Sequence, residues 1–274
     1  MPVVIISAAT FSHGDEVAAR AAELLRYRLV GRDEIVESAA RAYGSTPDRL
    51  IEALDEPASW LSMPAKERRA RLVAFQAALS DVLLEGDCVC HGLAAHLYVS
   101  GISHVFKSRV TAPIEARIAA AAERENLTPA KARKLVLGHD KRRRRWVTSL
   151  YDVDENDAAN FDLVIDHEAT GTEGAAVLIA DTARSRRFEP MTFSLAQMRD
   201  FALASKVRAL LFETDPEVVV RADDGAIHIR TKALRKKGGK AAAFEERARS
   251  VPQVRTVEIE IIDDVFARAA DSMR

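Results

Sequence analysis

The stretch VVIISAATFSHGDEVAARAAELL, residues 3–25, decides the fold of this chain. It opens with the unbroken apolar run 3–6, which is typical of a strand buried on both faces of a sheet. A short polar loop follows, and residues 15–26 then place their apolar side chains on one stripe of a helix. A strand, a loop and a helix in this order open many α/β domains.

The same alternation of buried strands and helices continues to residue 183. The expected strands are 88–91, 103–110 and 161–166, and the expected helices include 113–126, 128–137, 140–150 and 172–183. Strands that alternate with helices are joined by crossover connections. The sequence therefore predicts an α/β domain with a mostly parallel sheet flanked by helices.

The pattern of expected helices and strands changes near residue 189. The expected order is a helix at 195–211, strands at 217–222 and 226–231, a basic loop at 234–240, a helix at 241–250 and a strand at 254–262. The two strands flank Asp223-Asp224-Gly225, a strong hairpin signal. We therefore expect two domains, residues 1–186 and a small α+β domain (αββαβ) at residues 192–274.

Composition narrows the class of protein. The 274 residues are 48% hydrophobic and 30% charged, as in folded globular proteins, and the net charge of −1 gives no indication of nucleic-acid binding. Neither a signal peptide nor a membrane-spanning run is apparent, so a cytoplasmic location is expected. Cys88 and Cys90 fit a reducing compartment and are interpreted as structural, with a metal or redox role as the alternatives.

The loop after the first strand can be compared with the phosphate-binding pattern G-x-x-x-x-G-K-[ST]. Such a loop binds phosphate through backbone N–H groups, a lysine and a hydroxyl that holds magnesium. Here Gly14 matches the second glycine, but Ala9 replaces the first, Asp15 the lysine and Glu16 the hydroxyl residue. On the pattern alone, an ordinary turn between strand and helix is the competing interpretation.

Residues 7–18 resemble the opening of the cytidylate-kinase-like P-loop family, S-R-G-x-Y-S-x-G-K-E-V-A, at 11–14 and 16–18. Further similar segments follow in order along residues 1–185, at 26–28, 32–35, 91–96, 101–105, 140–146, 150–154 and 161–165. The resemblance implies a P-loop NTPase-like fold and the transfer of a phosphoryl group from ATP, with Mg²⁺, to a nucleoside monophosphate. It assigns nucleotide contacts to the loop residues Ser12, His13, Gly14, Asp15 and Glu16.

Asp15 stands where that family carries lysine. A carboxylate repels phosphate where an ion pair is wanted, so normal ATP-dependent transfer is in question. The alternative hypothesis is a catalytically inactive pseudokinase that senses nucleotides or regulates a partner.

Five consecutive cations, residues 141–145, occupy one predicted helix. In the resemblance they form the lid that closes over the phosphates, with Arg143 and Arg144 as its arginines and Asp140 as the acidic residue before them. Arginine suits this role because its planar fork binds phosphate oxygens in pairs. A solvated helix end and a nucleic-acid contact are the alternatives, and the second is disfavoured because only Trp146 supplies an aromatic ring. His91 and His96 are interpreted as structural, and no metal site is expected.

The C-terminal segment resembles a BON domain through its hairpin at 223–229 and the segment 251–257. BON-like modules are associated with lipid, membrane or protein partners. The basic residues Lys232, Arg235, Lys236, Lys237 and Lys240 are expected to face an anionic surface or to form a solvated loop.

Overall fold

The computed structural model describes residues 2–54, 63–92, 94–99, 101–151, 153–232 and 237–262, without the side chains of residues 65, 149, 150 and 237–240. The chain divides into two compact units. The first consists of Met1–Ile35 with Glu85–Ser194, and the second of Val36–Leu84 with Leu195–Arg274.

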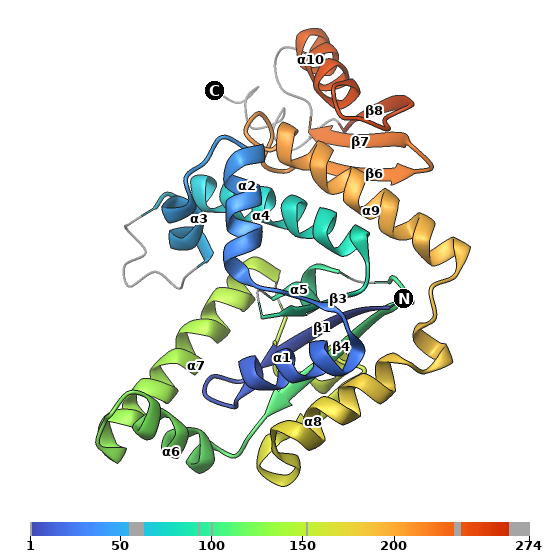
Figure 1. The fold of residues 1–274 in the computed structure, drawn as a ribbon. Helices are drawn as coiled ribbons and strands as arrows, with labels where there is room; N and C mark the ends of the chain where they lie inside the picture. The colour runs from blue at the N-terminus through green and yellow to red at the C-terminus, as the bar shows by residue number, and fades with distance from the viewer. Residues whose placement is uncertain are drawn as a thin grey trace. The chain divides into compact units, whose positions relative to one another are not determined.

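The first unit is built on a five-stranded sheet in the order β2-β3-β1-β4-β5. Its strands are β1 (Val3–Ala8), β2 (Arg28–Val30), β3 (Cys88–His91), β4 (Val105–Thr111) and β5 (Leu163–Asp166). All neighbouring strands are parallel, which confirms the predicted parallel α/β sheet. The loop after β1 therefore leaves the sheet at the carboxyl end of a central strand, where α/β proteins bind their ligands (Figure 1).

Two helices, α1 (Gly14–Leu25) and α8 (His167–Ala183), lie side by side on one face of this sheet (Figure 1). The core between them is apolar and contains Val4, Ile6, Phe106, Val110 and Ile179. Because side chains alternate along a strand, Ser7 and Arg109 point to the opposite face. The short helix α5 (Ala95–Tyr98) contacts β1.

The helices α6 (Ile114–Arg124) and α7 (Pro129–Tyr151) pack against each other through a small core of Ile118, Ala121, Ala132 and Val136. The prediction of two helices at 128–137 and 140–150 was wrong, because α7 is continuous. Gly138 lies in its middle, and an internal glycine costs only about 1 kcal/mol relative to alanine. α8 also begins earlier than predicted and contains a break at Gly171 (φ 64°).

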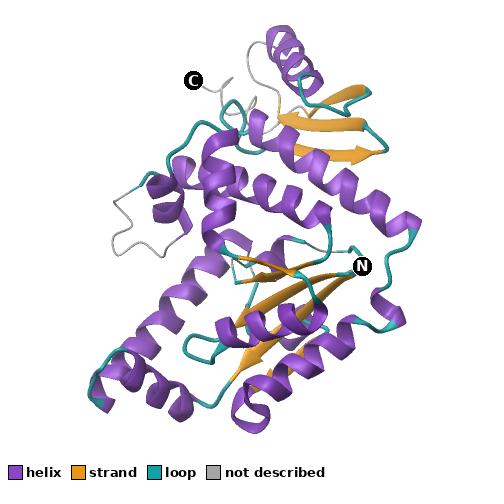
Figure 2. Ribbon diagram, in the orientation of Figure 1, coloured by secondary structure: helices purple, strands orange, loops and turns teal. Residues whose placement is uncertain are grey.

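The second unit contains α3 (Pro47–Leu54) and most of α4 (Ala65–Glu85) and α9 (Thr192–Leu211), while α2 (Arg32–Ala42) crosses the division between the units. Its three-stranded sheet has the order β6-β7-β8 (Figure 2). β6 (Val219–Asp223) and β7 (Ala226–Lys232) form the predicted antiparallel hairpin, and β8 (Thr256–Ile262) pairs with β7 in parallel. Asp224 and Gly225 both have positive φ, as the tight hairpin turn requires.

Apolar side chains of this sheet form one core with side chains of α9 and α10 (Lys237–Arg249). Phe244 is fully buried in this core, which also contains Val207, Leu211 and Ile229. α10 begins at Lys237, so the prediction of a loop through residue 240 was wrong at its end. Within the described ranges, no helix combines the length and apolar character of a membrane-spanning segment.

Candidate functional site

The conformation of the loop between β1 and α1 is defined by two residues with positive φ and by the hydrogen bonds of Ser12. Phe11 and His13 have φ near 60°, whereas Ala9 does not, so alanine is tolerated at the position of the first glycine. The buried Ser12 hydroxyl contacts two carbonyl oxygens, those of Ala9 (2.7 Å) and Val110 (3.2 Å). Ser12 thus ties the loop to β4 and points inward.

Gly14 is required for space. A Cβ at this position would lie 2.2 Å from the Cβ of Ala8 and 2.9 Å from Nε2 of His91. Both distances are shorter than any normal contact between such atoms. The one glycine that matches the phosphate-loop pattern therefore lets the end of β1, the start of α1 and the end of β3 meet.

Both acidic residues of the loop are turned toward histidines. Asp15 Oδ1 lies 2.9 Å from His91 Nδ1, and this hydrogen bond holds the pKa of Asp15 below its usual value. Glu16 lies 3.0 Å from His13, whose ring stacks on His167 with a centroid distance of 4.5 Å. The positions of the usual lysine and hydroxyl thus carry two carboxylates at the N-terminus of α1.

These residues do not fit a magnesium–triphosphate group in the usual way. The loop contributes no cation for the outer phosphates, and Glu16 occupies the place of the magnesium-binding hydroxyl. Among the described residues, no three His, Cys, Asp or Glu side chains converge on a common point that could hold a metal ion.

The predicted lid residues lie on α7, and two of them are held by partners. Asp140 accepts a hydrogen bond from Arg117 (2.6 Å), whose Nε also donates to the carbonyl of Thr10 (2.7 Å). Arg143 donates to the buried carboxylate of Glu155 (2.6 Å). Asp140 therefore positions Arg117 against the loop between β1 and α1, a role that the sequence did not indicate.

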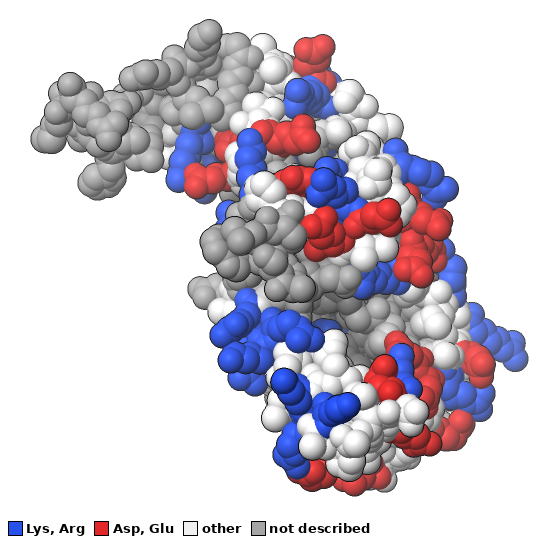
Figure 3. All heavy atoms as spheres, turned by 90° about the vertical axis from the view of Figure 1, so that its left-hand side faces the viewer, with Lys and Arg blue, Asp and Glu red and all other residues white. Residues whose placement is uncertain are grey.

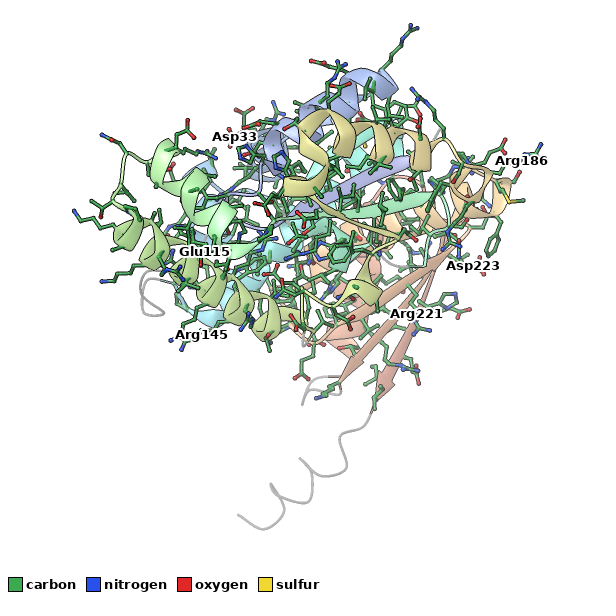
Figure 4. All side chains as sticks on the ribbon, turned by 90° about the horizontal axis from the view of Figure 1, so that it is seen from below. Asp33, Glu115, Arg145, Arg186, Arg221 and Asp223 are labelled. Carbon is green, nitrogen blue, oxygen red and sulfur yellow. The ribbon has the colours of Figure 1, made fainter. Side chains whose placement is uncertain are left out.

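The remaining cations of α7 form an exposed basic surface. Lys141, Arg142, Arg144 and Arg145 include no buried side chain. Figure 3 shows Lys and Arg side chains gathered over the part of the surface that carries α7, and Figure 4 shows Arg145 on the outer side of this helix. Arg144 therefore does not join Arg143 at the buried carboxylate.

A further group of polar residues, which the sequence did not reveal, surrounds the ring of Phe161. His96 stacks on this ring at 4.7 Å between centroids, and the guanidinium of Arg109 lies 5.5 Å from its centroid. Arg109 donates to Ser7 Oγ (3.2 Å) and to Asn156 Oδ1 (2.6 Å). Burial, together with Arg143, Arg109 and Lys107, lowers the pKa of His96 to about 3.

The signal for this group was present in β4. A central parallel strand is normally apolar on both faces, but VFKSRVT carries Lys107 and Arg109 on one of them. In the sequence of one strand, however, charged residues at every second position are equally typical of a face exposed to water, so the pattern did not identify a buried group. Lys107, Arg109 and Arg143 interact electrostatically with His96, and Arg109 also with Arg117, so the two strand cations lie among further arginines, a charge arrangement suited to phosphate.

Comparisons with known proteins identify a family that this chain resembles in sequence. A sequence model of the cytidylate kinase-like family matches residues 3–169. A cytidylate kinase from Staphylothermus marinus is 28% identical over 174 residues, which are 63% of this chain and 91% of that protein. The family match therefore ends before the C-terminal residues.

Two solved structures were compared as well. An uncharacterized protein from Eubacterium ventriosum superposes with a TM-score of 0.53 and 17% identity, covering 68% of this chain and 99% of that one. A likeness at this identity concerns the fold alone. A shikimate kinase from Acinetobacter baumannii, solved with shikimate, reaches a TM-score of 0.39 and 13% identity over 69% of this chain and 96% of that one.

Proposed function

This chain belongs to the cytidylate kinase-like family, and we propose that it binds a nucleotide but does not transfer phosphoryl groups efficiently. In this proposal the protein is a pseudokinase that senses a phosphorylated ligand. The observation that carries it is Asp15, which occupies the lysine position and is hydrogen-bonded to His91 at 2.9 Å.

The physical reason is electrostatic. Two like charges 4 Å apart repel by about 4 kcal/mol at an effective dielectric constant of about 20, an upper value for a carboxylate that faces water. A transition-state penalty of this size corresponds to a rate loss of about a thousandfold, before the missing attraction of lysine is counted. The lowered pKa of Asp15 keeps this carboxylate charged at neutral pH.

The proposal is tested with purified full-length protein, ATP, magnesium and each nucleoside monophosphate in turn. We expect nucleotide binding by titration calorimetry, with turnover at background for the native chain. The Asp15→Lys variant should bind ATP more tightly, because it exchanges repulsion for attraction. A chain that binds no nucleotide at millimolar concentration would rule out nucleotide sensing.

A second candidate function is phosphoryl transfer to a nucleoside monophosphate, such as CMP. It is favoured by Arg117, which donates to the carbonyl of Thr10 in the loop, and by Arg143, which lies close enough to Arg109 to interact with it electrostatically. Arginines so placed can stabilise charge on transferring phosphates. Turnover by the native chain that disappears in Arg143→Ala, while the folded state is retained, would establish this candidate and exclude the pseudokinase.

For the C-terminal residues we propose a BON-like module, residues 192–274, that binds an anionic surface. The order α9, β6, β7, α10, β8 supports this assignment. Lys232 is paired with Glu217 at 2.5 Å, whereas Arg235, Lys236 and the side chains of Lys237 and Lys240 lie outside the described residues.

The free, buried thiols of Cys88 and Cys90 suit a reducing, cytoplasmic setting.

The module is tested by co-sedimentation of the full chain with phosphatidylglycerol vesicles. We expect binding that weakens as salt is raised and is lost when residues 235–237 are replaced by glutamate. Equal sedimentation with neutral phosphatidylcholine vesicles, or none with either, would remove the anionic-surface proposal.

A further inference from the structure

Arg109 is a buried cation without an ion-pair partner among the described residues. The residue is only 7% exposed, and its two described hydrogen-bond acceptors, Ser7 and Asn156, are both neutral. Buried charges in proteins are normally paired, because removing an ion from water is costly. By contrast, Arg117 and Arg143 each have a carboxylate, Asp140 and Glu155.

Lys107, two residues earlier on the same face of β4, is in a similar position. Burial lowers the pKa of its ammonium group. Asp162 accepts hydrogen bonds from the backbone N–H of Lys107 (3.0 Å) and from Arg187 (3.3 Å), and no ion pair joins it to the ammonium in the described structure. The Asp162 charge nevertheless favours the charged form of this lysine.

His96 adds an unsatisfied donor and acceptor. The residue is 2% exposed, and neither ring nitrogen has a hydrogen-bond partner in the described part of the chain. A neutral imidazole carries one N–H donor and one acceptor nitrogen, and leaving such a group unpaired in the interior costs about 1–3 kcal/mol. Stacking on Phe161 holds the ring in place.

The charge of this region matches a dianion. Arg117 and Arg143 are paired with Asp140 and Glu155, whereas no ion pair among the described residues joins Arg109 or Lys107 to a carboxylate, so two positive charges remain for the dianion. Asp162 and Arg187, which pair with each other, do not change this balance.

We propose that His96 and Arg109, which both contact the ring of Phe161, form a binding site for a phosphate dianion, either free or as a phosphomonoester, together with Lys107 on the same face of β4 as Arg109. Arg109 and Lys107 supply the charge, and His96 donates a hydrogen bond from its neutral ring. The inference rests on the proposed function in one respect, that the ligand carries phosphate. It differs in placing the phosphate against β4 instead of at the N-terminus of α1.

The test titrates the full-length protein with inorganic phosphate and with CMP, by calorimetry and by the shift in unfolding midpoint. Lys107→Met keeps the apolar stem and removes the charge, so phosphate affinity should fall about 10- to 100-fold. His96→Phe keeps a ring on Phe161 and removes both nitrogens, with an expected loss of about 2- to 10-fold. Lys134→Met, an exposed lysine on α7, is the matched control and should change neither affinity.

Stability without ligand provides a second readout. Because Lys107 is partly buried and no ion pair joins it to another described residue, Lys107→Met should unfold at a higher temperature than the native chain in phosphate-free buffer, and the order should reverse in saturating phosphate. A structural lysine would instead lower the midpoint in both buffers, which would overturn the proposal.

The outcomes separate the two proposals. Binding of CMP that Lys107→Met and His96→Phe leave unchanged would overturn this site while the proposed function stands. A native chain that binds inorganic phosphate but no nucleotide would support the site and remove nucleotide sensing. If the native chain binds CMP but not inorganic phosphate, and both variants bind CMP more weakly, the site is specific for phosphomonoesters. If the native chain binds neither ligand, both proposals are removed.

Discussion

Replacing His96 with phenylalanine should make the protein less sensitive to mild acid. Burial and three neighbouring cations lower the pKa of His96 to about 3 in the folded chain, whereas an unfolded histidine has a pKa near 6.5. As the pH falls below 6.5, the unfolded chain takes up a proton at His96 and the folded chain does not. Stability is therefore lost from pH 6.5 downward, until the pH reaches the folded pKa near 3.

The magnitude follows from these two values. Between pH 7 and pH 5, proton uptake at one such histidine lowers the free energy of unfolding by about 2 kcal/mol. The pKa values of His104, His139 and His167 are also lowered by burial, so the native chain has a steeper total dependence. These three residues are unchanged in His96→Phe, and the difference between the two proteins isolates His96.

The assay is urea unfolding of both proteins at pH 7, 6 and 5, followed by circular dichroism at 222 nm. We expect the difference in unfolding free energy to change by about 2 kcal/mol in favour of His96→Phe as the pH falls from 7 to 5. The control is Phe106→Leu, which loses packing in the core on the other face of β4 without losing a titratable group. Its curve should run parallel to that of the native chain.

Parallel curves for the native chain and His96→Phe would refute the reasoning, because they would mean that His96 binds protons equally in both states. Nuclear magnetic resonance gives a direct check. The His96 ring signals of the folded chain should show no titration between pH 8 and pH 5.

Three further variants test other parts of the structure. Gly14→Ala should destabilise the chain by about 1–3 kcal/mol in urea unfolding, and adding Ala8→Gly should recover part of this loss by removing the 2.2 Å contact; equal stability of all three proteins would contradict the packing described. Glu155→Ala leaves Arg143 without its buried partner and should cost about 3–5 kcal/mol; an unchanged unfolding midpoint would show that this pair is not formed. Phe244→Ala opens a cavity in the second unit and should cost about 3–5 kcal/mol, measured as the unfolding of that unit, whereas a loss below about 1 kcal/mol would mean that the ring is not in a packed core.

Local patterns in the sequence predicted the elements well. The apolar run 3–6 and the helical stripe after it correspond to β1 and α1, and the Asp-Gly turn corresponds to the β6–β7 hairpin. These features depend on neighbours in the chain, so spacing alone identifies them. The family resemblance is likewise confirmed by the match over residues 3–169.

The contacts within the site depend on strand order and register, which the sequence does not show. Ile6 lies opposite His91 and Ser7 opposite Arg109, so one end of β1 brings together residues more than eighty positions apart. The sequence indicated that Asp15 would repel phosphate. It did not indicate the hydrogen bond between Asp15 and His91, because this contact depends on β3 lying beside β1. His96 was interpreted as structural because its spacing from His91 indicated no common ligand, and only the packing of Phe161 reveals its neighbours.

The charges near the end of β1 are divided between two groups of residues. Acidic side chains with histidine partners occupy the start of α1, while β4 and α7 supply an excess of cations. Asp15 at the loop is bonded to His91, whereas the two described hydrogen-bond acceptors of Arg109, Ser7 and Asn156, are both uncharged. Under the two proposals the loop and the β4 group differ in function: Asp15 acts on catalysis, and Lys107 and Arg109 act on binding. If both proposals hold, a kinase-like fold with a carboxylate at the lysine position binds a phosphorylated ligand through cations that lie on a different strand.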